Sequence, residues 1–126
     1  MELYIHIPFC VKKCEYCDFV SGVYDADLRR DYTRALIREM EMYAPDFCDT
    51  EFKTVYIGGG TPSWLEQKYM EQLLSAMQRL FDIDPEAEIT MEVNPGTVSA
   101  DFLSMIKSFG VDRLSIGLQS SDDTEL

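Results

Sequence analysis

The strongest constraint on the fold is a regular alternation of short strand-like and longer helix-like stretches. Apolar and polar residues alternate at Leu3–Ile7, Thr54–Gly58, Glu88–Val93 and Arg113–Gln119, the period expected of strands. Between these stretches apolar residues recur every three or four positions, as in helices that bury one face. The order βαβαβαβ predicts an α/β fold with a parallel sheet and right-handed crossovers.

The three helical stretches carry start or stop signals. The first begins at Asp27 and ends at Pro45. The second opens with Ser63 and Glu66, which have the spacing of a capping box. The third starts near Ser99, and Gly110 stops it. The apolar stripes along these helices are Leu28, Tyr32, Ala35, Leu36, Met40 and Tyr43; Leu65, Tyr69, Leu73, Met77 and Leu80; and Phe102, Met105, Ile106 and Phe109.

The strand parities predict a sheet with one apolar and one polar face. The apolar face, which should pack on the helices, carries Val55, Ile57, Ile89, Met91, Val93, Leu114, Ile116 and Leu118. The other face carries Tyr4, His6, Tyr56, Gly58, Thr90, Glu92, Ser115, Gly117 and Gln119. Such a sheet suits a barrel-like α/β fold, in which ligands bind at the carboxyl ends of the strands.

Composition narrows the class of protein. With 126 residues, 46% hydrophobic and 27% charged, the chain is predicted to form one globular domain. The formal charge of −12 argues against binding nucleic acid, because phosphate contacts need a basic patch. The first residues lack the basic and apolar regions of a signal peptide, and no apolar run is long enough for a membrane helix. We therefore expect a cytoplasmic protein.

Three of the four cysteines, Cys10, Cys14 and Cys17, fall within eight residues. Thiols stay reduced in the cytosol, so a disulfide framework is not expected. Three clustered thiolates favour a soft metal centre such as an iron–sulfur cluster, with one iron open to an outside ligand. The competing interpretation is zinc, with His6 or Cys48 as the fourth ligand. For Cys48 we favour the role of a small buried hydrophobe.

A glycine run follows the second predicted strand. Gly59 and Gly60 would let the backbone approach a ligand closely. No Gly-Lys-Ser/Thr sequence follows, so the run is not a phosphate-binding P-loop. The glycines, the cysteines, Glu92 and Gln119 all fall at predicted carboxyl ends of strands, so we expect the chemistry at one rim.

Four blocks in register resemble the radical S-adenosylmethionine (SAM) proteins. The residues of these blocks are most similar to those of the oxygen-independent coproporphyrinogen III oxidases and of their relatives, the heme chaperones of the HemW type. The blocks are Tyr4-Ile5-His6-Ile7-Pro8-Phe9-Cys10 with the further cysteines, Gly58-Gly59-Gly60-Thr61-Pro62, Glu92-Val93-Asn94-Pro95 and Ser115-Ile116-Gly117-Leu118-Gln119-Ser120. The resemblance implies that this chain forms the first four strands of a partial (β/α)6 barrel.

The same resemblance implies a 4Fe–4S cluster held by Cys10, Cys14 and Cys17, with SAM chelating the fourth iron. Reductive cleavage of SAM would release a 5′-deoxyadenosyl radical. The matching positions imply that Tyr4, Gly59 and Glu92 contact this SAM. They also imply that Tyr16, Gly60, Thr61 and Gln119 line a neighbouring position, where relatives can hold a second SAM.

One departure separates the two branches of the family. In the oxidases another cysteine follows the third one by two residues, and this chain has Phe19 there. The sequence Cys17-Asp18-Phe19 is similar to the chaperone branch. The resemblance thus favours a chaperone that inserts heme into respiratory enzymes over an oxidase acting on porphyrinogen propionates. A zinc-binding module and an inactive fragment are the alternatives.

The length is short for this family. Residues 1–126 correspond to the N-terminal part of a radical SAM core, without the last barrel strands and the C-terminal domain of relatives. We therefore expect incomplete activity from this chain alone. The fourth strand should leave an unpaired edge, which predicts self-association. The resemblance further implies heme or a porphyrinogen as ligand of the complete protein, and an electron donor of the flavodoxin or ferredoxin type.

Overall fold

The computed structural model describes residues 1–8, 15–60, 62, 65–94, 96 and 98–116, and of residues 15–26 the backbone only. Four strands form one parallel sheet in the order β1-β2-β3-β4. The elements are β1 (Glu2–Ile7), α1 (Glu15–Tyr43), a short 3₁₀ helix (Ala44–Phe47), β2 (Glu51–Gly59), α2 (Gln67–Leu80), β3 (Asp82–Val93), α3 (Ala100–Ser108) and β4 (Arg113–Ile116). The predicted alternation of strands and helices in a parallel sheet is confirmed.

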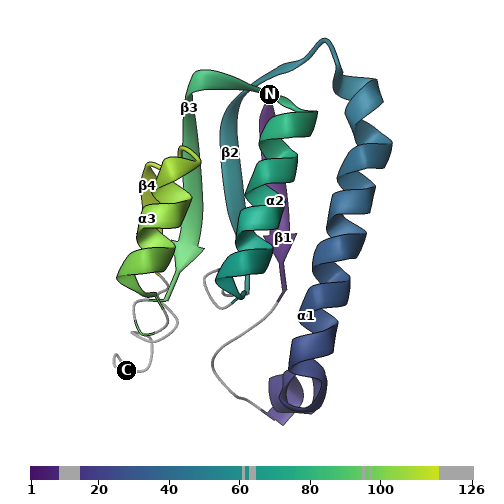
Figure 1. Cartoon of the computed structure of the whole chain (residues 1–126), viewed down its shortest axis with the longest axis vertical. Coiled ribbons are helices and arrows are strands. Elements are labelled where there is room, and N and C mark those ends of the chain that lie inside the picture. Colours follow the sequence, from purple (N-terminus) through teal and green to yellow (C-terminus); the bar gives the residue numbers. More distant parts are fainter. Residues whose placement is uncertain (9–14, 61, 63–64, 95, 97, 117–126) are drawn as a thin grey trace.

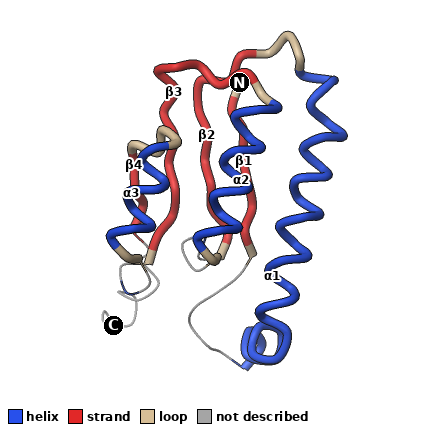
Figure 2. Tube along the Cα trace, in the orientation of Figure 1, coloured by secondary structure: helices blue, strands red, loops and turns tan. Residues whose placement is uncertain are grey.

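The helices cover one face of the sheet. Figures 1 and 2 show α2 and α3 in front of the strands, with α1 alongside β1. The apolar strand residues lie under the helices and are almost fully buried: Ile5, Ile7, Val55, Ile57, Ile89, Met91 and Val93. They meet Leu73 and Met77 of α2 and Phe102 and Ile106 of α3 in one core. Of the predicted polar residues, the described ones lie on the opposite face, which no described helix covers: Tyr4, His6, Tyr56, Gly58, Thr90, Glu92 and Ser115.

The edge strand β4 departs from the predicted pattern. Leu114 and Ile116, expected to pack on the helices, are 46% and 49% exposed. β4 pairs only with β3 among the described residues, and no described helix lies beyond it. The parity was therefore right, but a buried environment for these two side chains was wrong, because burial needs a neighbouring element that the described chain does not supply.

Helix α1 begins twelve residues before the predicted start at Asp27. Val20, Gly22 and Val23 are weak helix formers, so sequence propensity gave no indication of this first part. As a consequence, Tyr16 and Cys17 lie in the first turn of α1. The backbone of Cys17 is thus helical.

Helix α3 starts and ends as its sequence predicts. Ser99 is the N-cap, and its hydroxyl accepts a hydrogen bond from the Phe102 N–H at 3.0 Å. Gly110 adopts a φ of +99° just after the helix, a conformation that favours glycine.

The predicted capping box of α2 is wrong. Glu66 is itself the N-cap of α2, and its side chain makes no capping hydrogen bond. Instead its carboxylate accepts two bonds from the Arg29 guanidinium of α1, at 2.7 and 3.2 Å. Ser63 lies outside the described residues. Arg29 and Glu66 are 37 residues apart in sequence, so a local sequence pattern cannot predict their ion pair. The ion pair links α1 to the start of α2.

This ion pair predicts a pH-dependent contribution to stability. Hydrogen bonding to Arg29 lowers the pKa of Glu66 below its ordinary 4.5. Folding therefore favours the ionised carboxylate, and the stabilisation is present above pH 4.5 and is lost as pH falls through the lower folded-state pKa. Because the carboxylate is about one-third exposed, we expect Glu66→Gln to lower the free energy of unfolding at pH 7 by only about 1 kcal/mol.

Urea unfolding of both proteins between neutral and acid pH measures this difference. It should shrink toward zero as the carboxylate protonates. Glu71→Gln, an exposed change on the same helix, serves as the control. Equal pH profiles for the wild type and Glu66→Gln would contradict a stabilising ion pair.

Candidate functional site

The candidate site lies at the carboxyl ends of β1, β2 and β3, on the face of the sheet that the described helices leave open. The parallel register aligns Tyr4 of β1 with Tyr56 of β2, and Tyr56 with Thr90 of β3. Glu92 lies two residues beyond Thr90 on the same face, and Gly59 ends β2. The sheet therefore brings Gly59 and Glu92 together and places Tyr4 beside Tyr56 on the same face. Tyr4, Gly59 and Glu92 were predicted from three separate sequence blocks.

The Glu92 carboxylate is the centre of this arrangement. One oxygen accepts a hydrogen bond from the Tyr56 hydroxyl at 2.7 Å, and the other accepts one from the Gly59 backbone N–H at 3.1 Å. The side chain is half-buried. Because each carboxylate oxygen can accept more than one bond, acceptor capacity remains for a ligand after both contacts are made.

Tyr56 was not among the predicted site residues. The hydrogen bond to Glu92 is the largest cause that raises the pKa of Tyr56 above its ordinary 10.0, and burial adds to it. The phenol therefore stays protonated at neutral pH and acts as a donor to the carboxylate. Its place on the polar face of the second strand, beside Tyr4, was the available sequence indication, but only the register shows its contact with Glu92.

The glycine run leaves no room for side chains. A Cβ on Gly58 would lie 2.7 Å from the Tyr56 ring and 3.1 Å from the Glu92 carboxyl carbon. Gly59 has a φ of +118°, and a Cβ there would lie 2.7 Å from the carbonyl oxygen of Ile7. These two positions require glycine for space and for backbone conformation, respectively. The N–H of the next residue, Gly60, donates to the Ile7 carbonyl at 2.8 Å and ties the run to the end of β1.

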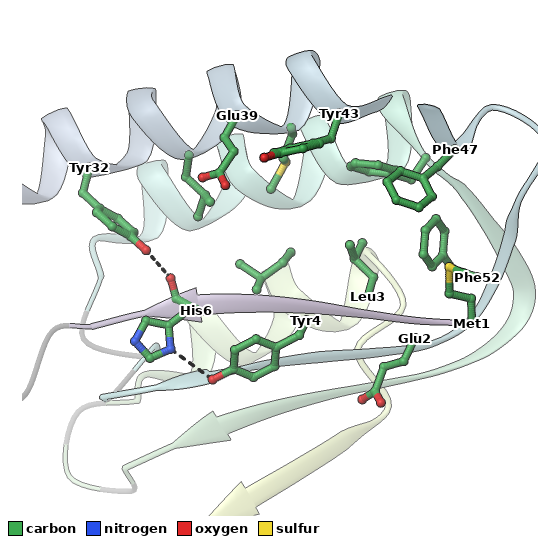
Figure 3. Close-up of a pocket in the computed structure, with 14 residues that line it drawn as sticks. Met1, Glu2, Leu3, Tyr4, His6, Tyr32, Glu39, Tyr43, Phe47 and Phe52 are labelled. Atoms are coloured by element: carbon green, nitrogen blue, oxygen red, sulfur yellow. Dashed lines mark hydrogen bonds between the residues drawn. The ribbon is translucent and has the colours of Figure 1, made fainter. Parts of the chain in front are cut away.

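Two aromatic residues border the carboxylate on the β1 side. The rings of Tyr4 and Tyr56 stack with a centroid distance of 6.0 Å and an interplanar angle of 17°. The Tyr4 hydroxyl also hydrogen-bonds Nδ1 of His6 at 3.0 Å, as Figure 3 shows. Tyr4 is 52% exposed. The site thus combines an accessible aromatic surface with a negative charge, which suits a cationic ligand.

The remaining predicted residues fall partly or wholly outside the description. Cys10, Cys14, Thr61 and Gln119 lie outside the described residues. For Tyr16 and Cys17 the backbone alone is described, at the start of α1. Among the described side chains, no three His, Cys, Asp or Glu gather closely enough to hold a metal ion.

Cys48 lies far from Cys17 in the structure. It follows the short 3₁₀ helix at the far end of α1, whereas Cys17 lies in the first turn of that helix. The intervening helix places them roughly 30 Å or more apart at 1.5 Å per residue. The alternative in which Cys48 is the fourth ligand of a zinc ion shared with Cys17 is therefore wrong. Cys48 is also exposed, which contradicts its expected role as a buried hydrophobe.

Within the described part of the chain, no helix is long and apolar enough to cross a membrane.

The chain resembles curated proteins along its whole length. It is 42% identical over 127 residues to the heme chaperone HemW of Escherichia coli (strain K12), covering 100% of this chain and 34% of that protein. It is 38% identical over 131 residues to HemW of Haemophilus influenzae, with the same coverage. A mitochondrial protein of Bos taurus, radical S-adenosyl methionine domain-containing protein 1, is 38% identical over 128 residues, 98% of this chain and 28% of that one. The chain thus spans about a third of the length of these relatives.

A solved structure and a family model agree with the sequence relatives. The structure of coproporphyrinogen III oxidase (HemN) from Escherichia coli, described as a radical SAM enzyme, matches with a TM-score of 0.81 and 32% identity. The match covers 94% of this chain and 27% of HemN. The model of the radical SAM superfamily matches residues 4–126. This chain, with its four parallel strands in alternating βα units, belongs to the radical SAM superfamily.

Proposed function

We propose that this chain is the cluster- and SAM-binding part of a heme-chaperone-like radical SAM protein. The observation that carries the proposal is the Glu92 carboxylate, which meets the Gly59 N–H and the Tyr56 hydroxyl at the carboxyl edge of the sheet. In this proposal Tyr4, Gly59 and Glu92 contact the methionine part of SAM, and Cys10, Cys14 and Cys17 hold a 4Fe–4S cluster.

The described residues fit SAM in charge and in space. The open acceptor positions of Glu92 suit the ammonium or a ribose hydroxyl of SAM. Replacing the hydrogens of Gly58 and Gly59 by methyl groups would crowd Tyr56, Glu92 and Ile7, so glycine at these positions keeps the Glu92 carboxylate in place with its remaining acceptor positions open. Tyr4 offers its ring face to a cationic group.

The donor set of the cysteine segment fits an iron–sulfur cluster, because thiolates are its usual ligands. When bound, the cluster would supply the single electron that cleaves the sulfonium of SAM reductively. This chain's own residues bind and orient: Glu92 fixes the amino-acid end of SAM, and Tyr56 and Gly59 hold the Glu92 carboxylate in position. We further propose that Tyr16, Gly60, Thr61 and Gln119 line a second SAM position.

Two observations support a chaperone rather than an oxidase. Phe19 stands where the oxidases carry a further cysteine. The HemW relatives of Escherichia coli and Haemophilus influenzae are 42% and 38% identical, whereas HemN is 32% identical. We therefore propose heme as the ligand of the complete protein, delivery to respiratory enzymes as its task, and a flavodoxin- or ferredoxin-type electron donor.

Oxidation of a porphyrinogen is the second candidate, because the TM-score of 0.81 to HemN supports a common scaffold. The cytoplasm is the proposed location, since three closely spaced thiols stay reduced there. With about a third of its relatives' length, this chain is proposed to bind cofactors without completing the activity of the whole protein.

Anaerobic reconstitution with iron and sulfide tests the cluster. We expect a brown, oxygen-sensitive protein, and we expect Cys14→Ala to lose the colour and most of the bound iron because one thiolate ligand is missing. Visible absorbance and iron analysis measure both. Cys48→Ala, at the other end of α1, should retain the cluster. A colourless protein that takes up zinc instead would contradict the proposal.

The role of Glu92 is tested by SAM affinity of the cluster-loaded chain. Glu92→Gln removes the charge that we assign to the ammonium, and affinity should fall about tenfold or more. Equilibrium dialysis with labelled SAM measures the change.

Glu88→Gln is the matched control for Glu92→Gln. Glu88 lies four residues earlier on the same strand and pairs with Arg113 at the edge of the sheet, so SAM affinity should stay unchanged. If Glu92→Gln retains the cluster and binds SAM as tightly as wild type, Glu92 does not contact the ligand.

We still predict that the chain self-associates through the exposed edge of β4. Leu114 and Ile116 lie on this edge strand, and a charge of −12 opposes the approach of two copies. We expect sedimentation to detect dimers whose fraction rises with salt, because salt screens the repulsion. Leu114→Lys should reduce the dimer. A monomer at every salt and protein concentration would contradict the prediction.

A further inference from the structure

Within the described part of the chain, the other edge of the sheet, β1, has backbone groups that no strand pairs, and a groove lies beside them. The carbonyls of Met1 and Ile7 accept bonds from the N–H groups of Lys53 and Gly60, so odd-numbered residues of β1 face β2. In a parallel strand alternate residues face opposite sides, so Glu2, Tyr4 and His6 direct their backbone groups away from β2. Among the described elements, β1 pairs with β2 alone.

A cavity of about 350 Å³ lies between this edge and helix α1. Figure 3 shows Tyr32, Glu39 and Tyr43 extending from α1 toward β1. The lining is mainly apolar and includes Leu3, Ile5, Leu36, Met40 and Phe52. At one end of the groove the Tyr32 hydroxyl donates a hydrogen bond to the His6 carbonyl. This bond occupies a backbone acceptor that an added strand would otherwise use. The N–H and C=O of Tyr4 are therefore the central backbone groups that face the groove.

The charged side chains that line the groove are acidic. Among the described lining residues these are Glu2 and Glu39, and none is a lysine or an arginine. Both residues are exposed, so their carboxylates are accessible to a cationic group of a ligand. The whole chain adds to the negative field with its charge of −12.

We propose that this groove binds an extended segment of another polypeptide, with alternating apolar and basic residues, as an added strand along β1. Its backbone would bond the N–H and C=O of Tyr4, its apolar side chains would meet Leu36 and Met40, and its basic side chains would reach Glu39 and Glu2. Addition of a strand to a free edge gains main-chain hydrogen bonds, and the side-chain contacts select the sequence.

Other occupants match the groove less well. A second copy of this chain would bring two charges of −12 together. A purely apolar molecule would leave the backbone groups of Tyr4 without partners. The proposal rests on the edge and the groove, and it stands whether or not the chain binds SAM.

Fluorescence anisotropy with a labelled peptide of alternating lysine and valine tests the proposal. We expect saturable binding by the 126-residue chain, and at least about tenfold weaker binding when every peptide nitrogen is methylated, because charge and side chains remain but the donors are lost. Glu39→Gln should weaken binding about three- to fivefold. Glu71→Gln, the same change of charge on α2, should leave it within about twofold.

Amide resonances of the ¹⁵N-labelled chain locate the contact, and those of Glu2 and Tyr4 should shift most. Equal affinity for the methylated peptide would overturn the proposal, since binding would then rest on charge alone. Shifts confined to other surfaces would overturn it as well. A dimer of the peptide-free chain that the peptide dissociates would assign the groove to a second copy instead.

Discussion

The hydrogen bonds of the Glu92 carboxylate hold the carboxyl edge of the sheet together. Through Gly59 and Tyr56 they fix the end of β3 to the end of β2. Gly60 continues the connection by donating to Ile7 at the end of β1. Three strands that enter the site from separate parts of the sequence are thus aligned within one network. A half-buried carboxylate needs such donors, because removing it from water without partners is costly.

The glycine run makes this network sterically possible. Any side chain at Gly58 would displace the Tyr56 ring or the carboxylate, and a side chain at Gly59 would meet the Ile7 carbonyl in an unfavourable backbone conformation. The apolar face of the same strands packs under α2 and α3. The sheet therefore separates two tasks: one face supplies stability through burial, and the other presents charge and aromatic rings.

Local pattern predicted most of the sheet, because strand alternation directly encodes which side chains are buried. It also predicted that the glycine run and Glu92 lie at one edge, since parallel strands end at a common edge. The place of Tyr4 in the site came from the family resemblance alone. Local pattern failed where the decisive partner is distant in sequence. Glu66 has the spacing of a capping residue, yet Arg29 determines its contact. Tyr56 gains its role from Glu92, 36 residues away. The early start of α1 and the exposure of Leu114 likewise depend on tertiary surroundings that spacing does not record.

From membership of the radical SAM superfamily and from the geometry of the carboxyl edge, we propose as the central claim that the carboxylate network at the ends of β2 and β3 forms part of a SAM site. A crystal structure of the anaerobically reconstituted chain with SAM tests this claim most directly. We expect the amino-acid end of SAM within hydrogen-bond distance of the Glu92 carboxylate and against the Gly59 backbone. SAM bound at the opposite end of the sheet, or on the face covered by α2 and α3, would contradict this claim.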